Sequence, residues 1–347
     1  MSTSVANFKI EINGSKLPPE LNAAVEAVTV EDELNVPALF CMKLNMVNSS
    51  AGMWRGIDLK TVKPGDKIKV SLGLDKVEPL ISGEITSLDL TFSEHSVLEI
   101  RGYDMLHRLR MGTRSKVFLK KKDSDIASEI AKEHGLTPVV DDTKTIYPYL
   151  FQNNLSNYEF LLERAARLDY ELYADDQKLI FVKSRASKAP VLPDMTFKKD
   201  FEKINLELRA LTRGSKVKVR GWDVKEKKAV EAEAKAGDEA TKMGGKETGF
   251  ELSAKALEES PIALPAESLI ELSEAKALAQ AAYNSRLREF IAGEGMCWGN
   301  ALLRSGKTVK LLGLGDRFSG IYYIVSTVHK YDTKGYTTTF KVKRTGL

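Results

Sequence analysis

Four histidines are the side chains best able to bind a metal or to carry a proton near neutral pH: His95, His107, His134 and His329. None stands at a ligand spacing, such as His-x-Glu or His-x-x-x-His, from another His, Cys or acid. His329 falls late in an alternating strand pattern, and His134 falls near a predicted helix end. We therefore predict surface or helix-capping roles for these histidines, and no metal ligands.

Three glycine-containing stretches imitate nucleotide-binding motifs. In "RSGKT", residues 304–308, Ala301 replaces the first glycine of a phosphate loop, and a strand follows where a helix is required. In "GLGDRFSG", Phe318 occupies the third glycine position of a dinucleotide fingerprint. "GEGMCWGN" lacks a preceding apolar strand and favours a tight loop. We predict no cofactor site.

Nucleophiles and paired acids also lack a catalytic setting. There is no Gly-x-Ser-x-Gly motif, and Cys41 and Cys297 form neither a metal-ligand spacing nor a disulfide framework. Asp141-Asp142 and Asp175-Asp176 fall in predicted loops or turns, where aspartate is common. A glycosidase-like pair of acids stays open, although no feature selects one. We predict no catalytic residues and no enzyme activity.

Composition and charge narrow the class of protein. The chain has 347 residues, enough for two or three domains, of which 43% are hydrophobic and 29% charged. The net charge of +4 comes from 52 basic and 48 acidic residues, which argues against a dedicated nucleic-acid binder. No signal-peptide pattern and no apolar run of the ~20 residues that span a membrane are present. We expect synthesis in the cytoplasm without a signal peptide, with both thiols buried.

Hydrophobic periodicity predicts strands in both end segments, residues 1–112 and 189–347. Strict alternation is typical of half-buried strands. In the first segment it places Ile68, Val70 and Leu72 on one strand face, and Leu88, Leu90 and Phe92 on another. In the last strand, Tyr336, Thr338, Phe340 and Val342 alternate with Thr337, Thr339, Lys341 and Lys343.

The middle segment, residues 113–188, predicts a small α/β unit. "DSDIASEIAKEHGLTP" indicates a helix capped by Asp123 or Ser124, with Gly135 at its C′ position. "QNNLSNYEFLLERAARLDYELY" indicates a second helix, in which Ser156 and Glu159 form a capping box. The same helix carries a Leu155–Phe160 staple and an apolar face of Tyr158, Leu161, Ala165 and Leu168. A hairpin turning near Asp175-Asp176 follows.

A charged insertion interrupts the last segment at about residues 224–250. It is rich in Ala, Glu and Lys, so we expect a solvated helix or a mobile excursion. "SEAKALAQAAYNSRLREF" follows as a helix whose predicted apolar face has five members: Ala275, Leu278, Ala282, Ser285 and Phe290.

The first and last segments also share an order of patterns. "VKPGDKIKVSLGL", "ISGEITSLDL" and "SVLEIRGYD" correspond to "LRSGKTVKLLGLG", "FSGIYYIVSTVHKYD" and "TTTFKVKR". We predict a mainly β fold, in which two related β-barrel domains flank a small α/β domain; chance similarity between β-rich segments is the alternative.

The stretch "QNNLSNYEFLLERAARLDYELYADDQKLIFV" resembles the helix-and-hairpin segment of the phage late control protein D / VgrG family, the baseplate hubs of contractile tails and injection systems. "LISGEITSLDL" and "LEIRGYDMLHRL" resemble the family's first barrel. "SKVKVRGWDVKEKKAV" is similar to the strand entering its second barrel, and residues 301–344 are similar to the closing half of that barrel.

The resemblance implies a homotrimer whose six barrels adapt a three-fold spike to a six-fold tail tube. Its implied partners are an Hcp-like tube ring, a spike protein and other baseplate components, with assembly into a virion tail or injection particle. Because the chain ends at Leu347, shortly after the last barrel strand, we expect the spike to be separate or truncated. The insertion would reach outward toward other baseplate parts.

A cell-wall-binding or wall-degrading tail-tip module is the alternative function, because "DSDIASEIAKEHGL" weakly resembles a LysM-type helix.

Overall fold

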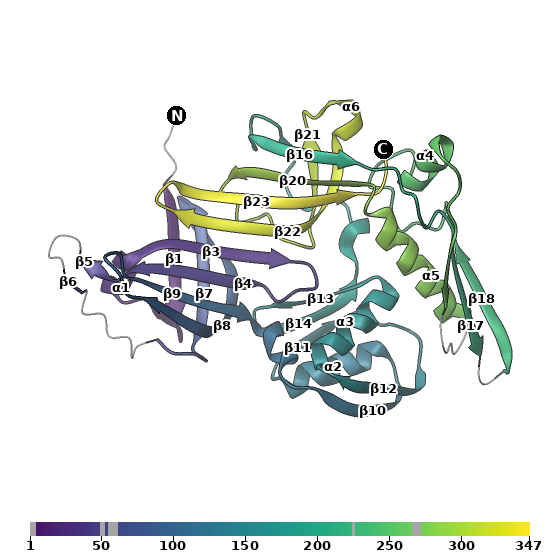
Figure 1. Ribbon diagram of the computed structural model, residues 1–347, viewed down its shortest axis with the longest axis horizontal. Helices are drawn as coiled ribbons and strands as arrows, with labels where there is room; N and C mark the ends of the chain where they lie inside the picture. Colours follow the sequence, from purple (N-terminus) through teal and green to yellow (C-terminus); the bar gives the residue numbers. More distant parts are fainter. Residues whose placement is uncertain (1–4, 49–52, 55–61, 224–225, 266–271) are drawn as a thin grey trace.

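The computed structural model describes residues 5–48, 53–54, 62–223, 226–265 and 272–347. Strands dominate, and most belong to one 13-stranded sheet (Figure 1). Its path is β16 (Lys203–Leu208), β20 (Ile291–Trp298), β23 (Gly335–Arg344), β22 (Gly320–Asp332), β3 (Val25–Glu33), β4 (Leu39–Asn45), β9 (Val97–Asp104), β8 (Lys76–Thr91), β7 (Lys67–Leu74), β1 (Ala6–Ile12) and β2 (Ser15–Lys16); β21 (Thr308–Leu312) pairs with β22 and with β15 (Met195–Thr196).

Alternation builds these strands as predicted, with one exception. Ile68, Val70 and Leu72 are buried on β7. The apolar face of β23 is buried, while Lys341 is exposed. Phe92, by contrast, lies just beyond β8 and is 70% exposed, so its predicted place on the inner face was wrong.

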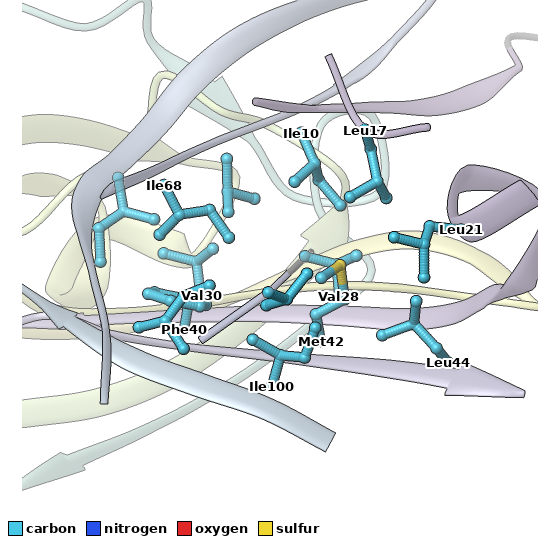
Figure 2. Close-up of a cluster of buried hydrophobic side chains, with 14 of the residues drawn as sticks. Ile10, Leu17, Leu21, Val28, Val30, Phe40, Met42, Leu44, Ile68 and Ile100 are labelled. Carbon is cyan, nitrogen blue, oxygen red and sulfur yellow. The ribbon is translucent and has the colours of Figure 1, made fainter. Parts of the chain in front are cut away.

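The first half of the sheet folds over its own apolar core. Figure 2 shows Val28, Val30 and Phe40, from β3 and β4, facing Ile10 and Ile68 from β1 and β7. A separate core, which contains Phe201, Ile324 and Phe340, lies in the second half. Each half thus buries its apolar faces mainly in a core of its own, as half-buried strands require, although Tyr336 of β23 belongs to the first core.

Backbone pairing between β3 and β22 joins the two halves, although they are almost 300 residues apart along the chain. Six antiparallel pairs run from Val28↔Tyr331 to Glu33↔Ser326. The prediction of two β-barrels therefore needs correction: the described strands form one continuous sheet, and no strand pair among them closes a barrel. Alternation could not reveal this joint, because it defines strand faces and leaves strand partners open.

His329 is buried in this joint, so its predicted surface or capping role was wrong. Its Nε2 lies 3.0 Å from the Leu303 carbonyl oxygen, which can only accept, so Nε2 donates. Its Nδ1 then accepts from the Tyr336 hydroxyl at 2.8 Å, with Thr338 Oγ1 at 3.1 Å. Burial, followed by the nearby Arg304 charge, lowers the pKa of His329 to about 4.

Asp32 at the end of β3 connects the joint to the "RSGKT" stretch. It accepts hydrogen bonds from Arg304 Nε at 2.9 Å and from Ser305 N and Oγ at 3.2 and 2.7 Å. Burial alone would raise the pKa of Asp32, but the Arg304 charge and these donors outweigh it and lower the pKa. The stretch that imitates a phosphate loop thus ties the second half to the first.

The insert contains two helices, a ribbon and a three-stranded sheet (Figure 1). As predicted, Ser156 and Glu159 form a capping box at the second helix, and Gly135 adopts a φ of 71° after the first. Asp123 and Ser124 do not cap the first helix; Lys122 precedes it, and Asp123 bonds Arg164 Nε at 2.5 Å. The elements are β10 (Arg114–Lys121), α2 (Asp123–Glu133), β11 (Thr137–Val140), β12 (Tyr147–Leu155), α3 (Asn157–Leu168), β13 (Tyr170–Asp175) and β14 (Lys178–Lys183).

The charged insertion forms part of a packed layer, which corrects the expected solvated helix or mobile excursion. Within it, β18 (Lys228–Ala234) is a strand whose Val230, Ala232 and Ala234 are buried against α5 (Leu272–Leu287). Residues 224–225 lie outside the described part. β17 (Val217–Asp223) was expected as the strand that enters a second barrel, and this expectation was wrong, because β17 lies in a separate sheet with β18 and β19 (Ile262–Pro265). α4 (Gly249–Ala256) follows the insertion.

The predicted face of α5 was partly right. Ala275 is buried, and Leu278 and Ala282 pack against the cluster, but Ser285 is exposed. The most buried face contains Ala275, Ala279, Tyr283 and Leu287, which pack in one cluster with Val217, Val219 and Val230 of the β17–β18 layer. The remaining short elements are α1 (Pro19–Ala24), β5 (Val47–Asn48), β6 (Met53–Trp54), η2 (Met105–Arg110), η3 (Arg185–Ser187) and α6 (Gly315–Phe318).

The His329 environment predicts acid sensitivity of the joint. An unfolded histidine takes up a proton below pH ~6.5, whereas folded His329 does so only near pH 4, so its contribution to stability is complete above pH ~6.5 and is lost as the pH falls toward 4. Between pH 7.5 and 4.5 the unfolding free energy of the wild type should fall. For His329→Gln this fall should be smaller by about 2–3 kcal/mol, as measured by denaturant titration at each pH. The exposed His95→Gln is the control and should keep the wild-type pH dependence; equal slopes for wild type and His329→Gln would contradict the prediction.

Candidate assembly interface

The two halves of the large sheet repeat one strand arrangement. In chain order the first half has β3, β4, β7, β8 and β9, and the second has β16, β20, β21, β22 and β23. In space both read first, second, fifth, fourth, third: β3-β4-β9-β8-β7 and β16-β20-β23-β22-β21. The three sequence patterns that correspond between the end segments fall on the third, fourth and fifth strands of each half.

The long fourth strand of each half carries an irregularity at the corresponding place. The register of β8 against β9 shifts between Ile85 and Ser87, and that of β22 against β23 shifts between Ile324 and Ser326. Before this bulge each strand pairs mainly with the third strand of its half, and after it with the fifth. A bulge bends a strand and changes the direction of its edge. The two halves therefore share a bend at the same place, just before the part of β22 that pairs with β3.

One joint is formed within the chain, and two matching strand edges remain open. After its bulge, β22 has β23 on one side and β3 on the other. The corresponding stretch of β8, Ser87–Thr91, pairs only with β9 among the described strands. β16 is the strand of the second half that corresponds to β3. Among the strands that the structure describes, it pairs only with β20.

Apolar side chains lie on the inner side of both open edges. Leu88 and Leu90 of β8 are half-buried against the first core, and Ile204 and Leu206 of β16 are half-buried against the second. Leu208, at the end of β16, is 37% exposed. Strand edges with apolar inner faces are where another chain can add by main-chain pairing.

The insert is attached to both halves, which sets its position relative to the joint. The Asn35 side chain, in the β3–β4 turn, accepts from Leu172 N at 2.8 Å, and the Asn35 carbonyl accepts from the Tyr158 hydroxyl at 2.6 Å. On the second half, the Tyr323 hydroxyl donates to Glu171. Burial raises the pKa of both groups.

Beyond α5, Arg288 completes this attachment. Its guanidinium lies 2.5 Å from Asp169 at the end of α3, and both side chains are largely buried. Arg167 of α3 reaches Glu274 of α5 at 2.7 Å. Hydrogen bonds and ion pairs from separate elements therefore hold the insert against both halves.

A cavity of about 360 Å³ lies where the two halves meet the insert. Asp104 lines it, and burial raises the pKa of this carboxyl to about 7. Its two oxygens accept from Ala38 N and Leu106 N at 3.0 and 2.9 Å, so the group holds the β4 start and η2 in place. Asp32 and Arg304, which also line the cavity, form an ion pair with each other. These lining residues thus make contacts that join the two halves and the insert.

The structure places the other candidate residues from the sequence apart from one another. His95 is exposed, His107 Nδ1 bonds the Asp104 carbonyl, and His134 Nε2 lies 3.0 Å from the Asn157 amide. Asp175-Asp176 does fall at the β13–β14 turn. No group of three His, Cys, Asp or Glu that could hold a metal ion occurs in the described ranges.

"GEGMCWGN" is not the predicted tight loop, because its first six residues belong to strand β20. A Cβ on Gly295 would lie 2.5 Å from a ring carbon of Phe340, so glycine leaves room for the ring to cross the strand. Of the two thiols, Cys297 is buried and Cys41 half-buried. None of the helices in the described residues is long and apolar enough to cross a membrane.

Solved structures share the fold at low sequence identity. A 43 kDa tail protein of prophage MuSo2 from Shewanella oneidensis has a TM-score of 0.72 at 14% identity, over 98% of both chains. A tail protein from Neisseria meningitidis MC58 has a TM-score of 0.71 at 12% identity, over 98% of this chain and 97% of that one. An Escherichia coli type VI secretion component has a TM-score of 0.58 at 12% identity, over 97% of this chain and 76% of that one.

These likenesses show that the fold is one found in tail proteins, one of them from a prophage, and in a type VI secretion component. No curated protein matches the sequence. A sequence-family model, described as the Alg8 N-terminal domain, matches residues 2–333, which is nearly the whole chain. The chain therefore belongs to the Alg8 N-terminal domain family.

Proposed function

We propose that this protein is a structural baseplate hub of a phage tail or contractile injection system. Three copies would form a ring in which each copy supplies two related tube-like domains. The carrying observation is the repeated strand order of the two sheet halves, joined edge to edge. A duplicated unit in a three-fold ring presents six similar units, which suits a six-fold tube on one face and a three-fold spike on the other.

The proposed domains are residues 1–112, 113–188 and 189–347. The two end domains would contribute to the ring, and the insert, attached to both, would hold their mutual angle. An Hcp-like tube ring, a spike protein and other baseplate components are the proposed partners. The tail and type VI secretion proteins that share the fold support this choice.

The solvent side of β23 is the proposed surface toward the ring lumen or a neighbouring subunit. Thr337, Thr339 and Lys341 lie on it, and Lys343 bonds Glu289. Lys341 is exposed and Lys343 is paired, so neither charge is left alone in the core. This exposure supports the strand register that the proposed surface requires.

A non-enzymatic role is part of the proposal, because ring formation explains the joint and the open edges without chemistry. The alternative, a wall-binding or wall-degrading module, finds no specific support. The helix that suggested it, α2, has Ile126, Ala127 and Ile130 buried inside the insert core.

The isolated chain is expected to form trimers. Mass photometry over a concentration series should show a species of three times the 38.5 kDa chain mass. Electron-microscopy class averages of that species should show rings with six similar lobes, because each copy contributes two related units. A chain that stays monomeric throughout, or that forms closed two-fold dimers, would refute the hub proposal.

A further inference from the structure

We infer that neighbouring copies pair edge to edge, through β16 of one copy and Ser87–Thr91 of β8 of the next, in the register of the β3–β22 joint. This inference rests on the proposed ring and names the surfaces and the residue register that close it. Its starting point is that the chain already contains one copy of this contact. The partner is therefore a second copy of the same chain.

The corresponding residues follow from the sheet register alone. The shared bulge aligns Ser87 of β8 with Ser326 of β22. Following the pairs from there across β9 and β4 to β3, and across β23 and β20 to β16, aligns Val30 with Leu206. Val30 and Leu206 both point toward the core of their own half. The two strands therefore correspond in which face is buried as well as in their place in the sheet.

Transferring the joint gives a definite set of contacts between copies. Within the chain, Thr327 faces Asp32 and His329 faces Val30. The same register sets two apolar pairs on the inner side, Leu88 against Leu208 and Leu90 against Leu206. On the outer side it sets Ser87 against Arg209, Asp89 against Glu207, and Thr91 against Asn205.

Side-chain chemistry agrees with this register on the inner side. All four inner residues are leucines, and Leu208 gains cover that it lacks in the isolated chain, where it is 37% exposed. Cross-strand apolar pairs of this kind stabilise a sheet and are buried when the pair closes. A shift by one residue would turn the leucines to the solvent side, so the apolar faces oppose slippage.

On the outer side, Asp89 and Glu207 would face each other as like charges. Arg209, which bonds Glu207 in the isolated chain at 2.5 Å, stands diagonally across from Asp89 in the transferred register. Diagonal neighbours on one sheet face lie within reach of a long side chain. Arg209 would therefore form ion pairs with both Glu207 and Asp89. Of the charged residues at this contact, it is the one whose partners would change when the ring closes.

The contact joins two different surfaces of each copy, so it propagates around a ring rather than closing a dimer. The joints would alternate: β3–β22 within a copy, then β8–β16 between copies. The two kinds of joint differ on their inner side. The β3–β22 joint within a copy buries the polar network of His329 and Asp32. The one between copies is apolar and can form after folding without leaving a buried charge unpaired.

Disulfide trapping tests the register directly. In a Cys41→Ser background, Thr91→Cys combined with Asn205→Cys places two thiols directly opposite, where Cβ atoms are roughly 5 Å apart and a disulfide can form. We expect oxidation to give covalent species up to the trimer on non-reducing gels. The matched control, Thr91→Cys with Glu207→Cys, moves one thiol two residues along the same face, by roughly 7 Å, and should give at least about ten-fold less cross-linking.

The outcomes separate this inference from the hub proposal. Trimers by mass photometry with no preference for the directly opposite pair would overturn the register and leave the ring standing. Absence of trimers in the wild type would overturn both. Covalent trimers from the opposite pair, with monomers from each single cysteine variant, support both.

Substitution at the open edge supplies a second test that does not depend on oxidation. Leu208→Asp places a charge on the inner side of the contact, and we expect at least about a 100-fold rise in the concentration needed for half trimer formation. Leu119→Asp is the matched control, because Leu119 is 62% exposed on the ribbon of the insert, away from both edges. Far-ultraviolet dichroism should match the wild type for both variants; equal trimer formation by both would contradict the β16 edge as the contact.

Discussion

Main-chain pairing between β3 and β22 is the interaction on which the rest of the structure depends. It brings strands from opposite ends of the chain into one sheet and so sets the angle between the two halves. Antiparallel pairing is strict in direction and register, since a shift of one residue would reverse every side chain. A flexible linker or a purely apolar contact would allow the angle between the two halves to vary more.

Polar side chains make the joint specific rather than simply strong. His329, neutral and fully hydrogen-bonded, and Asp32, held by Arg304 and Ser305, occupy positions that an apolar pair could fill. Buried polar groups of this kind cost desolvation and are satisfied only in one geometry. The insert adds further contacts of the same type, through Glu171 with Tyr323 and Asp169 with Arg288. Together they hold three parts of the chain as one body.

The open edge of β16 has a different character on its two sides. β16 is short, and its solvent side carries Lys203, Asn205 and Glu207, which discourages indiscriminate strand addition. Its inner side keeps apolar residues, so the edge is suited to a partner whose own apolar face points the same way. A second copy of the first half meets that requirement, because β22 meets it within the chain.

Several local elements and most strand faces were determined by the sequence alone, with Phe92 as an exception. The Ser156–Glu159 capping box, the turn at Asp175-Asp176 and the alternation of β23 follow from short-range chemistry, and all three are present. Tertiary structure decided the rest. The burial of His329, the strand state of β18 and the inclusion of the first six residues of "GEGMCWGN" in β20 depend on neighbours far along the chain. The joint itself was beyond sequence reasoning, because alternation specifies which face of a strand is buried, whereas the partner of a strand edge depends on backbone groups that every sequence shares.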